Sequence, residues 1–183
     1  MKLFFTLLIL FFVFPVFSQD TLRIEHGRDY DDSLVQPFMR SLNSENDFVV
    51  AFRAFYPGKS ARVSEYFVLT GSGAQLKAYV YSGINGRLKS LNLLPGSLDQ
   101  IWKTFQQNDL FGIRDEKEIP NFCPKKYDIY ESHTYEFTIL SKSRMKVLSY
   151  YNPEYYIVAC YGISERQNII NSVAVIDLLR PEN

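Results

Sequence analysis

Few side chains in this chain have the chemistry of a nucleophile or a general base. Its histidines and cysteines are His26, His133, Cys123 and Cys160. A catalytic thiol needs a base within hydrogen-bond reach and usually a third group that orients this base. Cys123 and His133 form the one set that merits naming, with Asp128 or Glu131 as the orienting acid. No glycine-rich elbow frames either cysteine, so a thiol-dependent hydrolase that uses Cys123 and His133 is the alternative hypothesis, and a non-enzymatic role is the first.

The two cysteines also have a structural interpretation. Both follow an expected secretory signal, and exported thiols tend to oxidise in pairs. We therefore predict a disulfide between Cys123 and Cys160. The alternative is two reduced buried thiols, because Cys160 lies in the apolar string Tyr-Ile-Val-Ala-Cys-Tyr, where a reduced cysteine also fits.

Neither a metal nor a cofactor is expected. A zinc site would have to gather Cys123, His133 and Cys160 with a carboxylate such as Asp128, and no short-spaced ligand pair is present. Four consecutive or nearly consecutive oxygen-bearing residues resemble a calcium loop without its glycine and its distal glutamate: Asp29, Asp31, Asp32 and Ser33. Capping of a following helix explains these acids more simply.

Tyrosines are concentrated in the segment Tyr150–Tyr156. Pro153 is expected to hold this segment extended, so that flanking tyrosines project to alternate sides. Exposed tyrosine suits recognition because it offers a large rigid contact area and a hydroxyl. We therefore name Tyr151, Tyr155 and Tyr156 as candidate binding residues. The alternative is that these rings pack across a sheet and under a helix.

The first 18 residues have the pattern of a removable secretory signal. Lys2 precedes an apolar stretch of 15 residues, Leu3–Phe17, which is short for the about 20 residues of a membrane-spanning helix. Val16 and Ser18 stand where a signal peptidase requires small side chains, so we expect cleavage after Ser18. The alternative is an uncleaved anchor. No second long apolar run follows, so we expect a periplasmic or secreted protein without stable membrane insertion.

Composition then limits what the exported part binds. Removal of 18 residues from 183 leaves 165, which is one domain at about 100 to 200 residues per domain. The chain has 20 basic and 20 acidic residues, and Lys2 is the one charged residue of the signal, which leaves 19 against 20 and a net charge of −1. A nucleic-acid binder needs a basic excess, so nucleic acid is not an expected partner.

Residues 19–46 are predicted to be an N-terminal arm with a short helix over Ser33–Leu42, whose first turn would contain Pro37. Residues 47–183 are predicted to be a single α+β domain. The first element of this domain is a strand over Asp47–Phe55, in which apolar residues occupy alternate positions on at least one face.

Two similar units follow this strand. In the first, Tyr66–Thr70 and Gln75–Ser82 alternate as the arms of a hairpin, and Gly71-Ser72-Gly73 supplies the positive φ angles of its turn. These glycines lack the Gly-Lys-Ser/Thr ending of a phosphate-binding loop. Ser97 and Gln100 then form a capping box, which predicts the start of a helix with apolar residues at helical spacing.

The second unit repeats this order. Thr134–Leu140 and Met145–Tyr151 alternate as paired strands, joined by a Ser-Lys-Ser-Arg turn. Ser164 and Gln167 form a second capping box, which favours a helix that extends to Leu179. The alternative is a strand, because this segment is rich in β-branched residues. Two ββα units side by side predict an antiparallel sheet of four or more strands with both helices on one face, an α+β two-layer sandwich.

This order of elements, over roughly residues 64–179, resembles that of small exported bacterial proteins of uncharacterised function and, more distantly, that of the emfourin-type inhibitors of metalloproteases. The resemblance lies in element order and hydrophobic spacing, so it assigns a functional role to no residue of this chain. We therefore expect an exported non-enzymatic protein that binds another envelope or secreted protein, or an envelope component.

Overall fold

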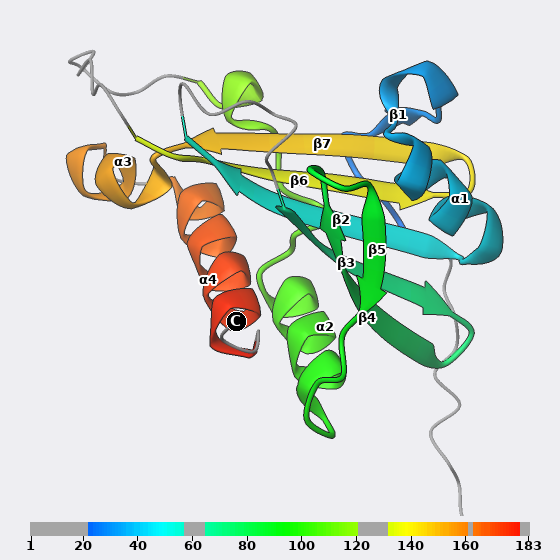
Figure 1. Ribbon diagram of the computed structural model, residues 1–183. Coiled ribbons are helices and arrows are strands. Elements are labelled where there is room, and N and C mark those ends of the chain that lie inside the picture. The colour runs from blue at the N-terminus through cyan, green and yellow to red at the C-terminus, as the bar shows by residue number, and fades with distance from the viewer. Residues whose placement is uncertain (1–21, 57–64, 121–131, 161–162, 180–183) are drawn as a thin grey trace, which may run out of the picture.

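The described part of the chain has an α+β fold. The computed structural model describes residues 22–56, 65–120, 132–160 and 163–179, and these form a seven-stranded antiparallel sheet with four α-helices (Figure 1). The α+β class predicted from the sequence is confirmed. The predicted signal, residues 1–18, lies outside the described residues.

The central strand of the sheet is β2. Its order is β1-β7-β6-β2-β3-β4-β5, and every pair of neighbours is antiparallel. The strands are β1 (Arg28–Asp29), β2 (Phe48–Phe55), β3 (Glu65–Ser72), β4 (Gln75–Ser82), β5 (Arg87–Ser90), β6 (Thr134–Ser141) and β7 (Arg144–Tyr151). Both expected hairpins are present, as β3–β4 and β6–β7, and β2 pairs with one strand of each.

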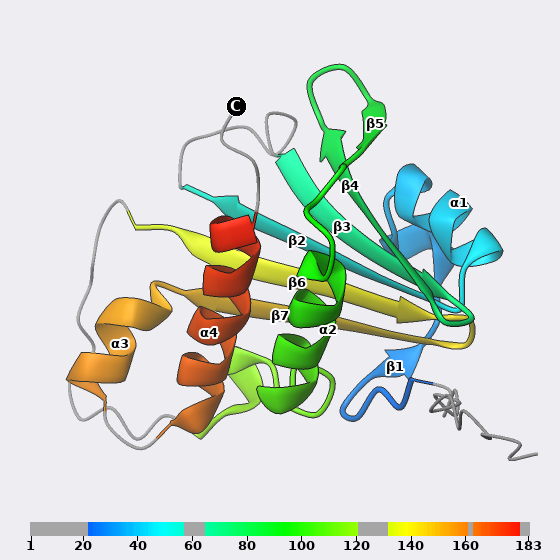
Figure 2. The ribbon, with the colours of Figure 1, turned by 90° about the horizontal axis from the view of Figure 1, so that it is seen from below.

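The two faces of the sheet are covered by different helices. Helices α2 (Ser97–Gln107) and α4 (Ser164–Leu179) lie on one face, and α1 (Pro37–Glu45) lies on the other, at one end of the sheet (Figures 1 and 2). The short helix α3 (Pro153–Ala159) follows β7 directly. Because β2 is covered on both sides, its sequence is apolar at nearly every position, and Val49, Val50 and Ala51 are all buried.

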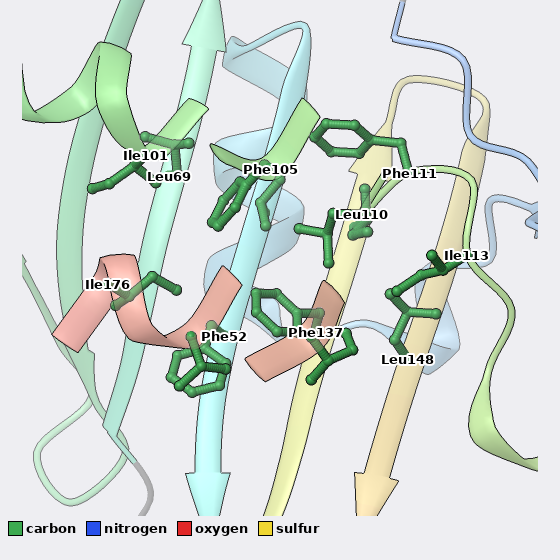
Figure 3. Packing of buried hydrophobic residues seen from close by; sticks show 14 of the residues in the cluster. Phe52, Leu69, Ile101, Phe105, Leu110, Phe111, Ile113, Phe137, Leu148 and Ile176 are labelled. Atoms are coloured by element: carbon green, nitrogen blue, oxygen red, sulfur yellow. The ribbon is translucent and has the colours of Figure 1, made fainter. Parts of the chain in front are cut away.

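The larger core fills the space between the sheet and the helices α2 and α4 (Figure 3). Phe137 of β6 lies at its centre and is fully buried. Its ring centroid is 4.9 Å from that of Phe52 and 6.0 Å from that of Phe105, which meets it edge-on. Aromatic rings from a strand and a helix thus fix the distance between the two layers.

A smaller core lies on the opposite face, beneath α1. Met39 and Leu42 of α1 are buried there against β2, β3 and β7. At the border of this cluster the ring of Phe38 stacks on that of Tyr81, with centroids 3.8 Å apart. The helix predicted over residues 33–42 therefore exists, but it begins at Pro37, where proline is favoured at the first helical position.

Gly71 has a different role from the one expected of it. It belongs to β3 and lies directly opposite Phe48 of β2, while the turn of the hairpin follows it. A Cβ atom added at Gly71 would fall 2.1 Å from Cε1 of Phe48, whose ring also stacks on Trp102 at 4.5 Å. Only glycine leaves room for this ring, so Gly71 is required by close packing rather than by a turn.

The helix starts also differ from the expected capping boxes. Ser97 is the first residue of α2, and the residue before it, Gly96, is the N-cap, with a φ of 82° and no side-chain cap bond. Ser164 is likewise inside α4. A serine inside the first turn is not the N-cap, and the residue before it takes that position. The Ser97 capping box was therefore wrong by one residue, although the helix that it predicted is present.

Two strands and one α-helix were not expected from the sequence. β1 and β5 are short edge strands, and α3 stands between the second hairpin and α4. Two- and four-residue strands are too short to show an alternating pattern.

Within the described ranges, no helix has both the length and the apolar character needed to cross a membrane.

Candidate functional site

The segment Tyr150–Tyr156 turns sharply instead of running extended. β7 ends at Tyr151, Asn152 adopts a left-handed conformation with a φ of 43°, and Pro153 is the first residue of α3. The expectation of an extended segment was wrong because the fixed φ of proline suits the first helical position, where its missing N–H is not needed.

This turn separates the tyrosines into two groups. Tyr150 points into the larger core and is fully buried. Its hydroxyl donates a hydrogen bond to the carbonyl oxygen of Arg114 at 2.5 Å. Burial, followed by the effect of nearby acids, raises the pKa of Tyr150, so its hydroxyl remains a donor. Tyr150 is therefore a core residue and not part of a binding surface.

The three predicted binding residues come together, and we call them the tyrosine patch: Tyr151, Tyr155 and Tyr156. The rings of Tyr155 and Tyr156 meet edge-on with centroids 5.4 Å apart, and those of Tyr151 and Tyr156 are 6.4 Å apart. Tyr155 is 38% exposed, and the other two are half-buried. The end of β7 and the first turns of α3 thus gather three rings at the surface.

Arg166 of α4 supports the patch from within. Its guanidinium carbon is 5.3 Å from the ring centroid of Tyr156, a cation–π contact. Its Nε donates to Oε1 of Glu116 at 3.1 Å, and Oε2 of Glu116 accepts the backbone N–H of Tyr151 at 2.9 Å. Glu116 therefore joins the end of β7, α4 and the patch.

One atom of this arrangement is left without a partner. Nη1 of Arg166 is buried and has no hydrogen bond within the part of the chain that the structure describes. Burial raises the pKa of the adjoining Tyr156, and Glu116 adds to this effect, so the Tyr156 hydroxyl stays protonated. Nη1 of Arg166 is consequently the donor that an added acceptor would meet here.

Sequence reasoning did not identify Arg166 or Glu116. A signal for Arg166 was present, because it continues the buried stripe of Ile169, Val173 and Ile176 at helical spacing. A charged residue on a buried stripe needs a partner, yet Glu116 lies 50 positions away and no local pattern connects the two.

The outer edge of β7 is protected by two acidic side chains, those of Asp115 and Glu116. Oδ2 of Asp115 accepts the backbone N–H of Ser149 at 2.7 Å, next to the bond from Tyr151 to Glu116. The 3-10 helix η3 (Glu116–Glu118) and its N-cap Asp115 thus place two carboxylates where a further strand would bind. This end of the edge is closed to strand addition, and the tyrosine patch lies beside it.

His133 has a partner on α3. Its Nε2 is 3.0 Å from Oε2 of Glu154, and its ring lies 4.5 Å from that of Tyr135. Burial and the neighbouring Glu154 raise the pKa of Tyr135. Cys123, Asp128 and Glu131 lie outside the described residues, so the arrangement of the hypothetical thiol site stays untested.

The remaining candidate ligands have structural roles. Asp29 pairs with Arg144 at 3.0 Å, and Asp31 accepts both the backbone N–H and the hydroxyl of Ser33. His26 lies in a turn with a φ of 52°. In residues 22–56, 65–120, 132–160 and 163–179, no group of three or more His, Cys, Asp or Glu side chains is placed to hold a metal.

Cys160 is buried at the end of α3, where its backbone N–H donates to the carbonyl of Tyr156. Its expected partner, Cys123, lies outside the described residues, so the disulfide stays a prediction.

The resemblance in element order to exported bacterial proteins and to emfourin-type inhibitors also stays a prediction. No family model, no curated protein and no solved structure matches the chain.

Proposed function

We propose that this chain is an exported, non-enzymatic protein of the periplasm or the secreted fraction. On this proposal it binds another envelope or secreted protein, or an envelope component, through the tyrosine patch. The expected signal over residues 1–18 supports export. The gathering of Tyr151, Tyr155 and Tyr156 at one exposed turn supports binding and is the observation that carries the proposal.

The patch has a rigid base, which favours recognition. Glu116 and Arg166 connect the end of β7 to α4, and the backbone of Asn152 bonds back to His133 at 2.9 Å. A partner that contacts the tyrosines would therefore pay little conformational entropy on this side of the interface. Such pre-organised aromatic residues are the usual sites of large binding contributions.

The test is a double substitution in the patch. Tyr151→Ala with Tyr155→Ala is expected to weaken partner capture from envelope extract of the source organism about tenfold or more, since truncation of each anchor ring typically costs about 1 kcal/mol or more. The backbone bond of Tyr151 to Glu116 does not depend on its side chain, so thermal unfolding should change little.

A matched control removes apolar surface elsewhere. Ile84→Ala with Leu94→Ala changes side chains that are 74% and 78% exposed, remote from the patch along the sheet. Capture should be retained in this variant. Equal capture by the patch variant and the wild type would refute the proposed role of the tyrosines.

We also propose that the fold derives from two ββα units, arranged as a two-layer sandwich. In support, α2 and α4 each come after one of the two hairpins and lie on the same face of the sheet (Figure 2). β5 and α3 are additions to these units, and α1 covers part of the other face.

The Cys123–Cys160 disulfide belongs to the same proposal, because an oxidising compartment would favour it. Mass spectrometry of the exported protein is expected to give a mass about two units below that of the chemically reduced form. Equal masses would show two free thiols. That result would contradict the disulfide and restore Cys123 as a candidate nucleophile.

A further inference from the structure

Arg166 is a buried cation whose hydrogen bonds are incomplete. A guanidinium has five N–H bonds, and Arg166 is only 7% exposed. Nε is satisfied by Glu116, but Nη1 is buried with no partner among the described residues. A charged donor that is buried without an acceptor is costly, so this atom indicates an acceptor that comes from outside the described chain.

The unpartnered atom adjoins the tyrosine patch. The guanidinium lies against the half-buried ring of Tyr156, and Tyr156 contacts the exposed Tyr155 edge-on. Because Nη1 is buried, a hydrogen bond to a group bound on the patch requires the Tyr156 ring to shift.

The charges around Arg166 favour an acceptor with one negative charge over an acceptor with two. Glu116 already neutralises part of Arg166, at 3.1 Å from Nε, and Glu165 pairs with the neighbouring Arg114 at 2.7 Å. A doubly charged phosphate would be repelled by Glu116 more strongly than a singly charged group. A carboxylate carries one charge, and its planar pair of oxygens matches the planar guanidinium.

We infer that Arg166 and the tyrosine patch form a carboxylate-recognition site. The ligand carboxylate accepts from Nη1 of Arg166, and an apolar group next to this carboxylate lies on Tyr155 and Tyr156. This inference rests on the proposed role of the patch and specifies the chemistry of its partner. An acidic side chain of a polypeptide and a free organic acid share this chemistry.

The test is a titration monitored by NMR on the purified exported protein. The observed signals are the side-chain N–H of Arg166 and the backbone amide of Tyr155. N-acetylphenylalanine is the probe, and its amide, which lacks the negative charge, is the matched control. The acid is expected to give saturable shifts at both positions, and the amide should bind at least tenfold more weakly.

Two further probes distinguish the sources of the carboxylate. One is the end-blocked pentapeptide Gly-Phe-Glu-Phe-Gly, and the other is the same peptide with Gln in place of Glu. Tighter binding of the Glu peptide than of N-acetylphenylalanine would assign the site to an acidic polypeptide segment. The reverse order would assign it to a small organic acid.

Variants separate this site from simple apolar adsorption. Arg166→Lys keeps a charge beside Glu116 but lacks the second guanidinium nitrogen, and binding of the acid should weaken at least tenfold. If this variant does not fold, Tyr155→Ala changes an exposed ring and should weaken binding to a similar extent. Equal binding of acid and amide, equal binding by the wild type and the folded variants, or no shift at Arg166 would overturn the inference.

These outcomes are independent of the capture experiment. Tyrosine-dependent capture without carboxylate binding would leave the proposed function standing and refute only the recognition chemistry. Carboxylate binding at Arg166, together with partner capture that does not change when the tyrosines are substituted, would refute the proposed role of the tyrosines in capture and leave the recognition chemistry standing.

Discussion

Replacement of Glu116 by alanine is expected to lower the free energy of unfolding by about 3 to 5 kcal/mol, the usual loss when one partner of a buried ion pair is removed. The side chains of Arg166 and Glu116 are 8% and 21% exposed, so solvent screens this pair only weakly. Without Glu116, both Nε and Nη1 of Arg166 would be buried donors without a partner, and the backbone N–H of Tyr151 would lose its acceptor.

The measurement is urea-induced unfolding of the wild type and the variant under the same conditions. Glu118→Ala is the matched control, because Glu118 belongs to the same turn and is exposed. Its effect should stay within about 0.5 kcal/mol. A loss below about 1 kcal/mol for Glu116→Ala would show that the connection between η3, β7 and α4 contributes little.

A second large effect is expected from Lys146, the buried lysine of β7. It is 3% exposed, and its Nζ donates to the carbonyl oxygen of Phe111 at 3.0 Å. Burial lowers the pKa of Lys146 from 10.5 to about 8, although nearby acids, Asp109 foremost, oppose this shift. The folded protein therefore holds this proton less tightly than the unfolded chain.

The sign of the pH dependence follows from this difference. Between about pH 8 and 10.5 the unfolded state binds more protons than the folded state, so the free energy of unfolding rises with pH in this window. Over the full window the rise amounts to about 3 kcal/mol. Raised pKa values of buried tyrosines such as Tyr150 act in the opposite direction above about pH 10, so the informative range ends near pH 9.5.

Lys146→Met is expected to remove this rise and to stabilise the protein at pH 7 by about 1 to 3 kcal/mol, because the variant does not bury a charge. The carbonyl of Phe111 would stay satisfied, since it also accepts the backbone N–H of Glu25 at 3.0 Å. Chemical denaturation at pH 7 and pH 9.5 gives both quantities.

Lys142→Met is the control for this experiment, because Lys142 lies in the turn of the same hairpin with its side chain 68% exposed. Its substitution should leave the pH dependence unchanged. If Lys146→Met kept the rise of the wild type, the rise would come from another group. A clear loss of stability at pH 7 would mean that the bond to Phe111 outweighs the cost of burial.

Much of the α+β fold was predictable from the sequence because it follows from local periodicity. The alternating strands over residues 134–140 and 145–151 and the helical spacing after residue 97 each report which face of an element is buried. The same reasoning placed Gly71 in a turn and missed its contact with Phe48, because a cross-strand partner 23 positions away leaves no local pattern.

The candidate site was predictable in part for the same reason. Tyr151, Tyr155 and Tyr156 were found because they are neighbours in the sequence. Their relative positions were not, because Asn152 and Pro153 convert the segment into the start of a helix. Glu116 and Arg166 come from separate elements, and only the packing of α4 and η3 against β7 brings them to the tyrosines.

The sequence by itself thus determined the longer strands and helices and their buried faces, since these depend on residues three or four positions apart in a helix and two apart in a strand. Tertiary structure alone decided which charges are buried. Arg166, Glu116 and Lys146 acquire their surroundings from segments remote in sequence, and the desolvation of a charge depends on everything packed around it rather than on its neighbours in the chain.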